Sequence, residues 1–100
     1  MTHVVRNDEG AITVTDAALT HIVVQSAESV EGARVRRARR KVGVELDGRR
    51  ARVELELAVA YGKVLPDVAQ DVQLRVTDAL TQMCGLEVTA VDVTVEELDR

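Results

Sequence analysis

The stretch VGVELDGRRARVELELAV, residues 42–59, alternates apolar and polar side chains on both sides of Asp47-Gly48. A period of two is typical of strands with one buried face, and Asp-Gly between two such runs favours a two-residue turn. If Asp47-Gly48 is the whole loop, Leu46 lies opposite Arg49, and the apolar and charged residues separate onto opposite faces. The stretch therefore predicts a β-hairpin.

A helical pattern flanks the hairpin on each side. Apolar residues recur every three or four positions from residue 16 to about residue 30, after Thr15 as a capping residue and before Gly32. A second stripe of the same kind covers residues 66–84 and ends at Gly85. Each stripe predicts an amphipathic helix that buries one face.

Two shorter runs complete the pattern of elements. Residues 10–15 and 86–95 alternate like strands, and the second run changes phase between Val88 and Val91, which predicts a β-bulge near Thr89-Ala90 or a late strand start. The order β-α-β-β-α-β predicts an α+β fold, a two-layer sandwich of an antiparallel or mixed sheet with two helices on one face. Our first choice of topology is the split β-α-β arrangement of ferredoxin-like domains.

Length and composition limit the classes of protein that remain. One hundred residues make one domain, 1–100, with a core of about 10–96 and polar, mobile tails at 1–8 and 97–100. Aromatic residues are only 1% of the chain, so stacking on bases is nearly excluded, and Cys84 is alone, which excludes an intrachain disulfide. No run resembles a signal peptide or a membrane span, so we expect a soluble, cytoplasmic protein.

No spacing of residues indicates catalysis. His3 lies in a predicted tail, His21 lies near the polar side of the first helix, and Cys84 has no basic neighbour in sequence that would lower its pKa. The simpler interpretations are that the histidines lie on the surface and that Cys84 is a small buried residue. We therefore expect no catalytic residue, no metal and no cofactor.

The distribution of charge is the feature that most suggests a function. Residues 34–52 hold nine basic and two acidic residues, a net charge of +7, whereas the rest holds four basic and fifteen acidic residues, a net charge of −11. The candidate contact residues for an anionic lipid surface, an RNA backbone or an acidic protein are Arg36, Arg37, Arg39, Arg40 and Lys41. The simpler interpretation is a solvated face, with Arg39 and Lys41 paired to Glu56 and Glu54 across the hairpin.

The order of glycines, helices and valine-rich strands resembles the alkaline shock protein family of bacteria. The matching residues are Gly10, Ile12, Val14, 27–32, 42–45, Tyr61-Gly62, Val68-Ala69, Val72-Gln73, Val76, 83–86 and 91–93. Two positions depart from the family pattern, since Cys84 stands where Thr is common and Asp92 where Asn is common. The family has no established chemistry, so the resemblance implies a non-enzymatic protein.

The resemblance implies an envelope stress-response protein that self-associates and is recruited to the inner face of the membrane by a partner that carries the anchor. For self-association we predict a homomeric contact through the helices, at Leu74, which points away from its stripe, and Val24, at the margin of its own. The alternative is a nucleic-acid-binding module that uses the run from Arg34 to Lys41. The acidic remainder of the chain and the scarcity of aromatic residues make nucleic acid the less favoured partner.

Overall fold

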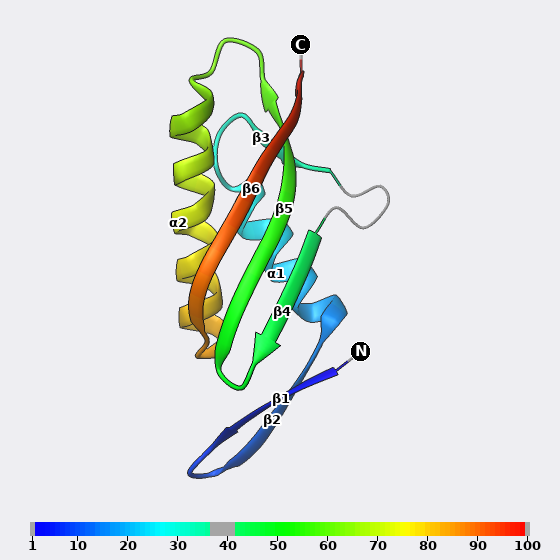
Figure 1. Ribbon diagram of the computed structural model, residues 1–100, viewed down its shortest axis with the longest axis vertical. Coiled ribbons are helices and arrows are strands. Elements are labelled where there is room, and N and C mark those ends of the chain that lie inside the picture. Colours follow the sequence, from blue (N-terminus) through cyan, green and yellow to red (C-terminus); the bar gives the residue numbers. More distant parts are fainter. Residues whose placement is uncertain (1, 37–41, 100) are drawn as a thin grey trace.

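The computed structural model describes residues 2–36 and 42–99, and two helices and six strands lie within these ranges. In chain order the elements are β1 (Thr2–Asn7), β2 (Gly10–Thr15), α1 (Asp16–Glu28), β3 (Ala33–Val35), β4 (Val42–Asp47), β5 (Arg50–Ala60), α2 (Leu65–Cys84) and β6 (Glu87–Asp99). Strands β3 to β6 form one sheet, and both helices lie on one face of it (Figure 1). The predicted two-layer α+β architecture is confirmed.

The central hairpin, β4–β5, forms with a register that is shifted by one residue along each strand. Asp47 pairs with Arg50, so the loop is Gly48 and Arg49 and not Asp47-Gly48, and Leu46 lies opposite Ala51. Gly48 has a φ of 62°, and primed two-residue turns require such a positive φ at the first loop position. The predicted register, which placed Leu46 opposite Arg49 and the glycine second in the loop, is wrong.

The shifted register also changes the expected ion pairs across the hairpin. Glu54 lies opposite Gly43 and not opposite Lys41 as predicted, and Lys41 itself lies outside the described residues. Arg39 lies outside the described residues, and so does its expected pairing with Glu56. The partner of Leu46 changes by two positions, from Arg49 to Ala51. Side chains alternate with a period of two, so this change leaves the charged residues on the outer face.

The topology differs from the ferredoxin-like arrangement. Strand β6 runs parallel to β5 along its whole length, whereas β3 and β4 pair antiparallel with successive parts of the opposite edge of β5. The sheet is therefore mixed, and α2 connects two adjacent parallel strands as an ordinary β-α-β crossover. The prediction failed because residues 10–15, expected as a strand of this sheet, pair with other residues.

Those other residues are the supposed N-terminal tail. Residues 2–7 form β1, which pairs antiparallel with β2 from Thr2–Thr15 to Asn7–Gly10 in a separate two-stranded sheet. This hairpin, which we call the N-terminal arm (residues 2–15), projects from the end of the body near the β4–β5 turn (Figure 1). Residues 97–99 were also expected in a tail and instead extend β6.

The core lies between the helices and the inner face of the sheet. Val23 of α1, Val72 and Val76 of α2, and Val53 and Leu57 of β5 are fully buried within one apolar cluster. Burying apolar area in this way is the main stabilising term, roughly 25 cal/mol for each Å² removed from water. The two stripes predicted from periodicity are thus the faces that fold against the sheet.

The helix ends follow the local signals in the sequence. The Thr15 hydroxyl accepts a hydrogen bond from the Ala18 amide (3.1 Å), as a helix N-cap does. Pro66 lies in the first turn of α2, and Gly85 ends that helix in the left-handed conformation with a φ of 67°. Both predicted helices are confirmed to within one or two residues at each end.

The predicted bulge in the last strand is also present. Ala51 pairs with Val88 and Arg52 pairs with Ala90, which leaves Thr89 as the extra residue. Its hydroxyl donates to the Ala51 carbonyl at 3.1 Å and so ties the bulge to β5. The bulge brings Val91 onto the inner face, where it is buried.

Candidate functional site

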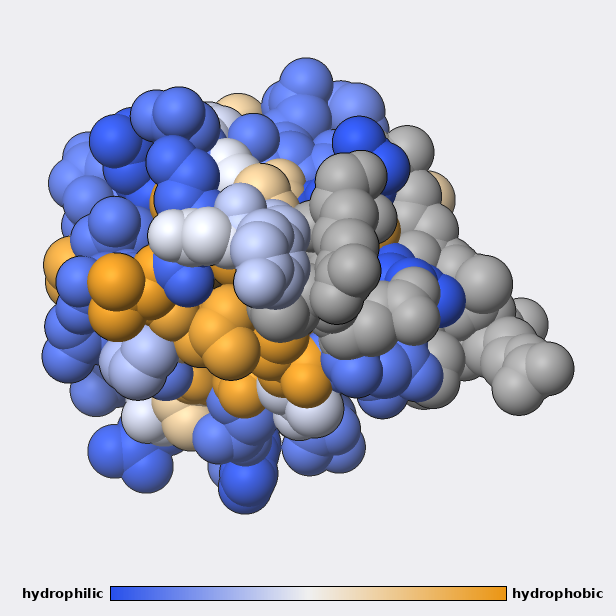
Figure 2. Space-filling model, turned by 90° about the horizontal axis from the view of Figure 1, so that it is seen from above, coloured by the Kyte–Doolittle hydropathy of each residue, from blue (hydrophilic) through white to orange (hydrophobic). Residues whose placement is uncertain are grey.

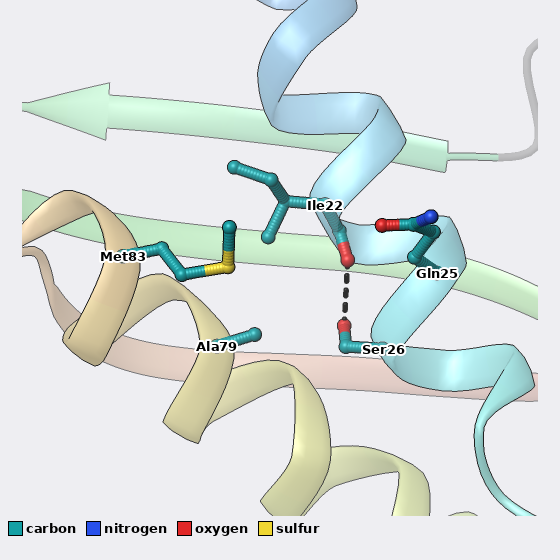
Figure 3. Close-up of a pocket in the computed structure, with 5 residues that line it drawn as sticks. All are labelled: Ile22, Gln25, Ser26, Ala79 and Met83. Atoms are coloured by element: carbon teal, nitrogen blue, oxygen red, sulfur yellow. Dashed lines mark hydrogen bonds between the residues drawn. The ribbon is translucent and has the colours of Figure 1, made fainter.

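An open groove separates the two helices on the surface of the helical layer. It is lined by Ile22, Gln25 and Ser26 of α1 and by Ala79 and Met83 of α2, and has a volume of about 320 Å³ (Figure 3). The Ser26 hydroxyl donates to the Ile22 carbonyl at 2.8 Å, so it is already satisfied within its own helix. The groove therefore offers mainly apolar contact, with the Gln25 amide at its rim.

Met83 is the unusual residue of this groove. It follows Val76 and Leu80 at helical spacing and so continues the buried stripe, yet it is 68% exposed whereas Leu80 is fully buried. A flexible thioether at an uncovered position of a buried stripe can adapt to different contact surfaces. Periodicity could not reveal this exposure, because it depends on where α1 lies and not on the pattern within α2.

The two residues predicted for self-association have opposite environments. Leu74 is 65% exposed on the side of α2 that faces away from the sheet, as its position relative to the stripe predicts. Val24 is only 7% exposed and belongs to the core cluster, so a surface role for Val24 is wrong. The buried face of α1 is wider than the spacing of its apolar residues suggested, because α1 contacts both α2 and the strands β3 and β4.

The helical layer around Leu74 is acidic. Within α1 and α2 the charged residues are one arginine, Arg75, and five acidic residues, which are Asp16, Glu28, Asp67, Asp71 and Asp78. Asp71 and Asp78 lie one turn before and one turn after Leu74, so that this leucine is flanked by carboxylates. Such a surface favours a partner that presents basic side chains around an apolar contact.

The predicted basic site is described only at its beginning. Arg36 follows β3, its amide donates to the Glu56 carbonyl at 2.9 Å, and its guanidinium lies 3.6 Å from the Glu96 carboxylate. The remaining four predicted contact residues, Arg37, Arg39, Arg40 and Lys41, lie outside the described residues. The run thus starts at the edge of the sheet, next to β5.

The outer face of the sheet holds an ion pair between β5 and β6 that was not predicted from the sequence. Arg52 binds Asp92 through two guanidinium nitrogens, at 2.9 and 3.2 Å, and this hydrogen bond raises the pKa of Arg52. On the neighbouring strand β4, Glu45 lies opposite Arg52. The predicted register, with Leu46 opposite Arg49, would have placed Glu45 opposite Arg50. Asp92, which departs from the family pattern, therefore has a structural partner in this protein.

The groups that were weighed for catalysis in the described residues include one side chain on each helix. His21 is exposed on α1, and Cys84 is half-buried at the end of α2, where burial raises the pKa of its thiol. A raised thiol pKa keeps the sulfur protonated at neutral pH and lowers its reactivity. Within residues 2–36 and 42–99, no group of three or more His, Cys, Asp or Glu side chains could hold a metal ion.

One exposed surface was missed in the sequence. The turn between β5 and α2 presents Tyr61, Val64 and Leu65, which are 65%, 60% and 36% exposed. Seen from this end of the molecule, hydrophobic side chains form one patch with hydrophilic residues above and below it (Figure 2). The available signal was the apolar pair Val64-Leu65 just after Gly62-Lys63, outside both the strand alternation and the helical stripe.

Comparison with known proteins identifies the family. The family model that matches residues 33–100 describes the alkaline shock protein family, with a cell envelope-related function, and the chain belongs to this family. This match confirms the predicted resemblance over β3 to β6, including both strands of the central hairpin and α2. No curated protein matched the chain.

Solved structures show the same fold in MamM-CTD. A double variant of MamM-CTD is 18% identical, with a TM-score of 0.59, over 84% of this chain and 95% of that one. A copper form (18% identical, TM-score 0.58, 83% and 98% covered) and a cadmium form (20% identical, TM-score 0.56, 81% and 94% covered) of other variants are similar. At this identity the likeness concerns the fold alone. Among the described residues, no helix is long and apolar enough to cross a membrane.

Proposed function

We propose that this protein acts at the cell envelope in a stress response, without catalysing a reaction, by self-association and by binding a membrane-anchored partner on the cytoplasmic side. The family description supports the envelope role. The observation that carries the mode of action is Leu74, which is 65% exposed at the centre of an acidic helical layer. An apolar anchor inside a charged rim is a common arrangement in protein interfaces.

The distribution of charge favours a contact between two different surfaces of the protein. Two helical layers of the same kind would bring the carboxylates flanking Leu74 together, and such a contact is disfavoured. The segment 34–52 of another copy carries a net charge of +7 and complements this acidic surface. Self-association would then be heterologous, between the helical layer of one copy and the basic segment of the next.

A mixing experiment tests this arrangement. Leu74→Lys disrupts the helical surface, and a variant with Arg36, Arg37, Arg39 and Arg40 changed to Gln disrupts the basic one. We expect each variant alone to sediment as a monomer and the two mixed to form dimers, because each retains one intact surface. A wild type that remains monomeric at high concentration, or variants that assemble like wild type, would contradict self-association through these surfaces.

Partner binding is tested separately in cells. Fractionation should recover wild-type protein with membranes together with an anchored protein that co-purifies, and the four-arginine variant should lose this recovery. Thermal melting of that variant should match wild type, because the run lies outside the apolar stripes of the sequence. The nucleic-acid alternative predicts instead a tight complex with RNA or DNA that weakens steeply with salt and is lost in the same variant.

A further inference from the structure

Strand β6 leaves one long edge of the sheet without a partner. It has 13 residues and pairs with β5 on one side along its length, whereas no strand among the described residues pairs with its other side (Figure 1). The register omits Thr89 and Glu96, so the regular part of this free edge is residues 90–95. An unpaired edge presents a row of backbone amide and carbonyl groups to which a further strand can bind.

The backbone groups of Val91 point toward this free side. The Ala51 carbonyl of β5 points toward β6, because it accepts from the Thr89 hydroxyl at 3.1 Å, and Val53, two residues further on, therefore points the same way. In a parallel ladder one residue of each opposite pair bonds across, so Val91, which lies opposite Val53, directs its groups to the free side. There the Gln73 side-chain amide of α2 donates to the Val91 carbonyl at 2.9 Å, in the place where a neighbouring strand would donate.

Val93 and Val95 continue this edge. They lie two and four positions after Val91, so their backbone groups point to the same free side. Their side chains are only half-buried and pack at the margin of the core, whereas Val91 is buried. An added strand would therefore bond to the edge and also place aliphatic side chains beside these valines.

The helix next to this edge turns an uncharged side toward it. Gln73 marks that side of α2, and Ala69 and Thr77, four positions before and after Gln73, lie on the same side and are half-buried. No charged residue of α2 lies three or four positions from Gln73; these residues are Asp67, Asp71, Arg75 and Asp78. Aliphatic residues of an added strand would thus meet no charge from this side of the helix.

The outer side of the edge is acidic. Residues 87–99 hold five acidic residues and no basic one. Arg52 binds Asp92 through Oδ2, and the Asp92 side chain is 52% exposed, so its Oδ1 can accept from a further donor. A lysine or arginine at the facing position of an added strand would supply that donor. A second copy of β6 would instead bring the carboxylates of two strands together, which is disfavoured.

We propose that an extended segment of the anchored partner, with aliphatic residues at alternate positions and Lys or Arg between them, adds to the free edge of β6 as a further strand. The inference rests on the proposed recruitment by that partner and adds a second contact to the one through the basic run. Cytoplasmic segments close to a membrane span are rich in Lys and Arg, which suits an acidic edge. A helical segment fits less well, because its backbone groups are bonded internally and would leave the edge unpaired.

Fluorescence anisotropy with the purified full chain tests the proposal. The probe is a labelled peptide that alternates lysine and valine and is long enough to cover residues 90–95. The control peptide has the same composition, with the lysines and the valines in two separate blocks. We expect saturable binding of the alternating peptide and at least about tenfold weaker binding of the control, because only alternation directs the valines to one face and the lysines to the other.

Two substitutions locate the contact. Gln73→Lys places a positive charge beside the edge and should weaken binding about threefold to fivefold, whereas Gln82→Lys, the same change half a turn away on α2, should leave binding unchanged. Val93→Pro removes an outward amide, which an edge strand tolerates, and should abolish binding. If Val93→Pro does not fold, the comparison of Gln73→Lys with Gln82→Lys decides the test, because both positions are exposed on a helix.

Several outcomes would overturn the proposal. They are the absence of saturable binding, equal binding of the two peptides, and equal affinities of Gln73→Lys and Gln82→Lys. Hydrogen exchange at Val93 and Val95 should slow when the peptide binds, and slowing in the N-terminal arm or β4 instead would contradict this edge as the site. A change in the sedimentation of Val93→Pro without peptide would show that a second copy occupies the edge. Each of these failures leaves recruitment by an anchored partner standing, because cell fractionation tests it separately.

Discussion

The chain forms two antiparallel hairpins with two-residue turns, and only one of them has a core. The hairpin of β4 and β5 lies under both helices, and Val53, Leu55 and Leu57 of β5 are buried. The N-terminal arm pairs with itself alone, and Val4 remains 48% exposed. An isolated two-stranded hairpin is marginally stable in water, whereas additional strands and a helical cover stabilise it. The same kind of strand pairing is therefore expected to be much more stable in the β4–β5 hairpin than in the N-terminal arm.

The largest effect should come from truncation within the central hairpin. Leu57 is fully buried at the centre of β5, so Leu57→Ala removes apolar contacts and leaves a cavity. We expect a loss of about 2–5 kcal/mol in the free energy of unfolding, measured by chemical denaturation. Val4→Ala in the arm serves as the control and should change the same quantity by less than about 0.5 kcal/mol. Similar losses for both would show that the arm belongs to the cooperative core.

The turn glycines provide a second comparison, with a smaller effect. Gly48 and Gly10 have φ values of 62° and 137°, and a Cβ added at either would meet no atom within 4 Å. Any penalty for alanine is therefore conformational, of roughly 1–2 kcal/mol. Gly48→Ala should lower the free energy of global unfolding by this amount, whereas Gly10→Ala should loosen only the arm. An equal loss for both variants would contradict the difference between the hairpins.

Hydrogen exchange compares the local stability of the two hairpins directly, which changes in global stability cannot do. Amides of the arm should exchange through local opening, with protection far below that of β5, whose amides should approach the global free energy of unfolding. Removing residues 2–9 should then change the unfolding free energy by less than about 1 kcal/mol. Comparable protection in β1 and β5 would mean that the arm has a further partner in solution.

Sequence reasoning was most accurate where the determinants are local. The two helices, their caps at Thr15 and Gly85 and the bulge at Thr89 follow from side-chain period and backbone chemistry within a few residues. The hairpin was predicted, but its register was off by one residue on each strand, because both registers keep the same side chains on the same face of the sheet. The observed register pairs Leu46 with Ala51, where the predicted one placed it opposite Arg49.

The surfaces were harder to predict than the elements. Leu74 was identified because its position relative to the α2 stripe determines which way it points. Val24 was misplaced and Met83 was missed, because their exposure depends on how α1 crosses its neighbours. The exposure of Tyr61, Val64 and Leu65 was missed because periodicity says little about residues between a strand and the first turn of a helix.

By itself the sequence determined the composition of the core, the helices, the separation of charge and the family resemblance, since each depends on which residues occur and at what spacing. The tertiary structure alone decided that β6 runs parallel to β5, that residues 10–15 pair with the preceding segment, and that Tyr61, Val64 and Leu65 are exposed between β5 and α2. The physical reason is that strand partners and exposed surfaces arise from contacts between distant segments. Many pairings satisfy the same alternation of residues, and only the packing of the whole chain selects one of them.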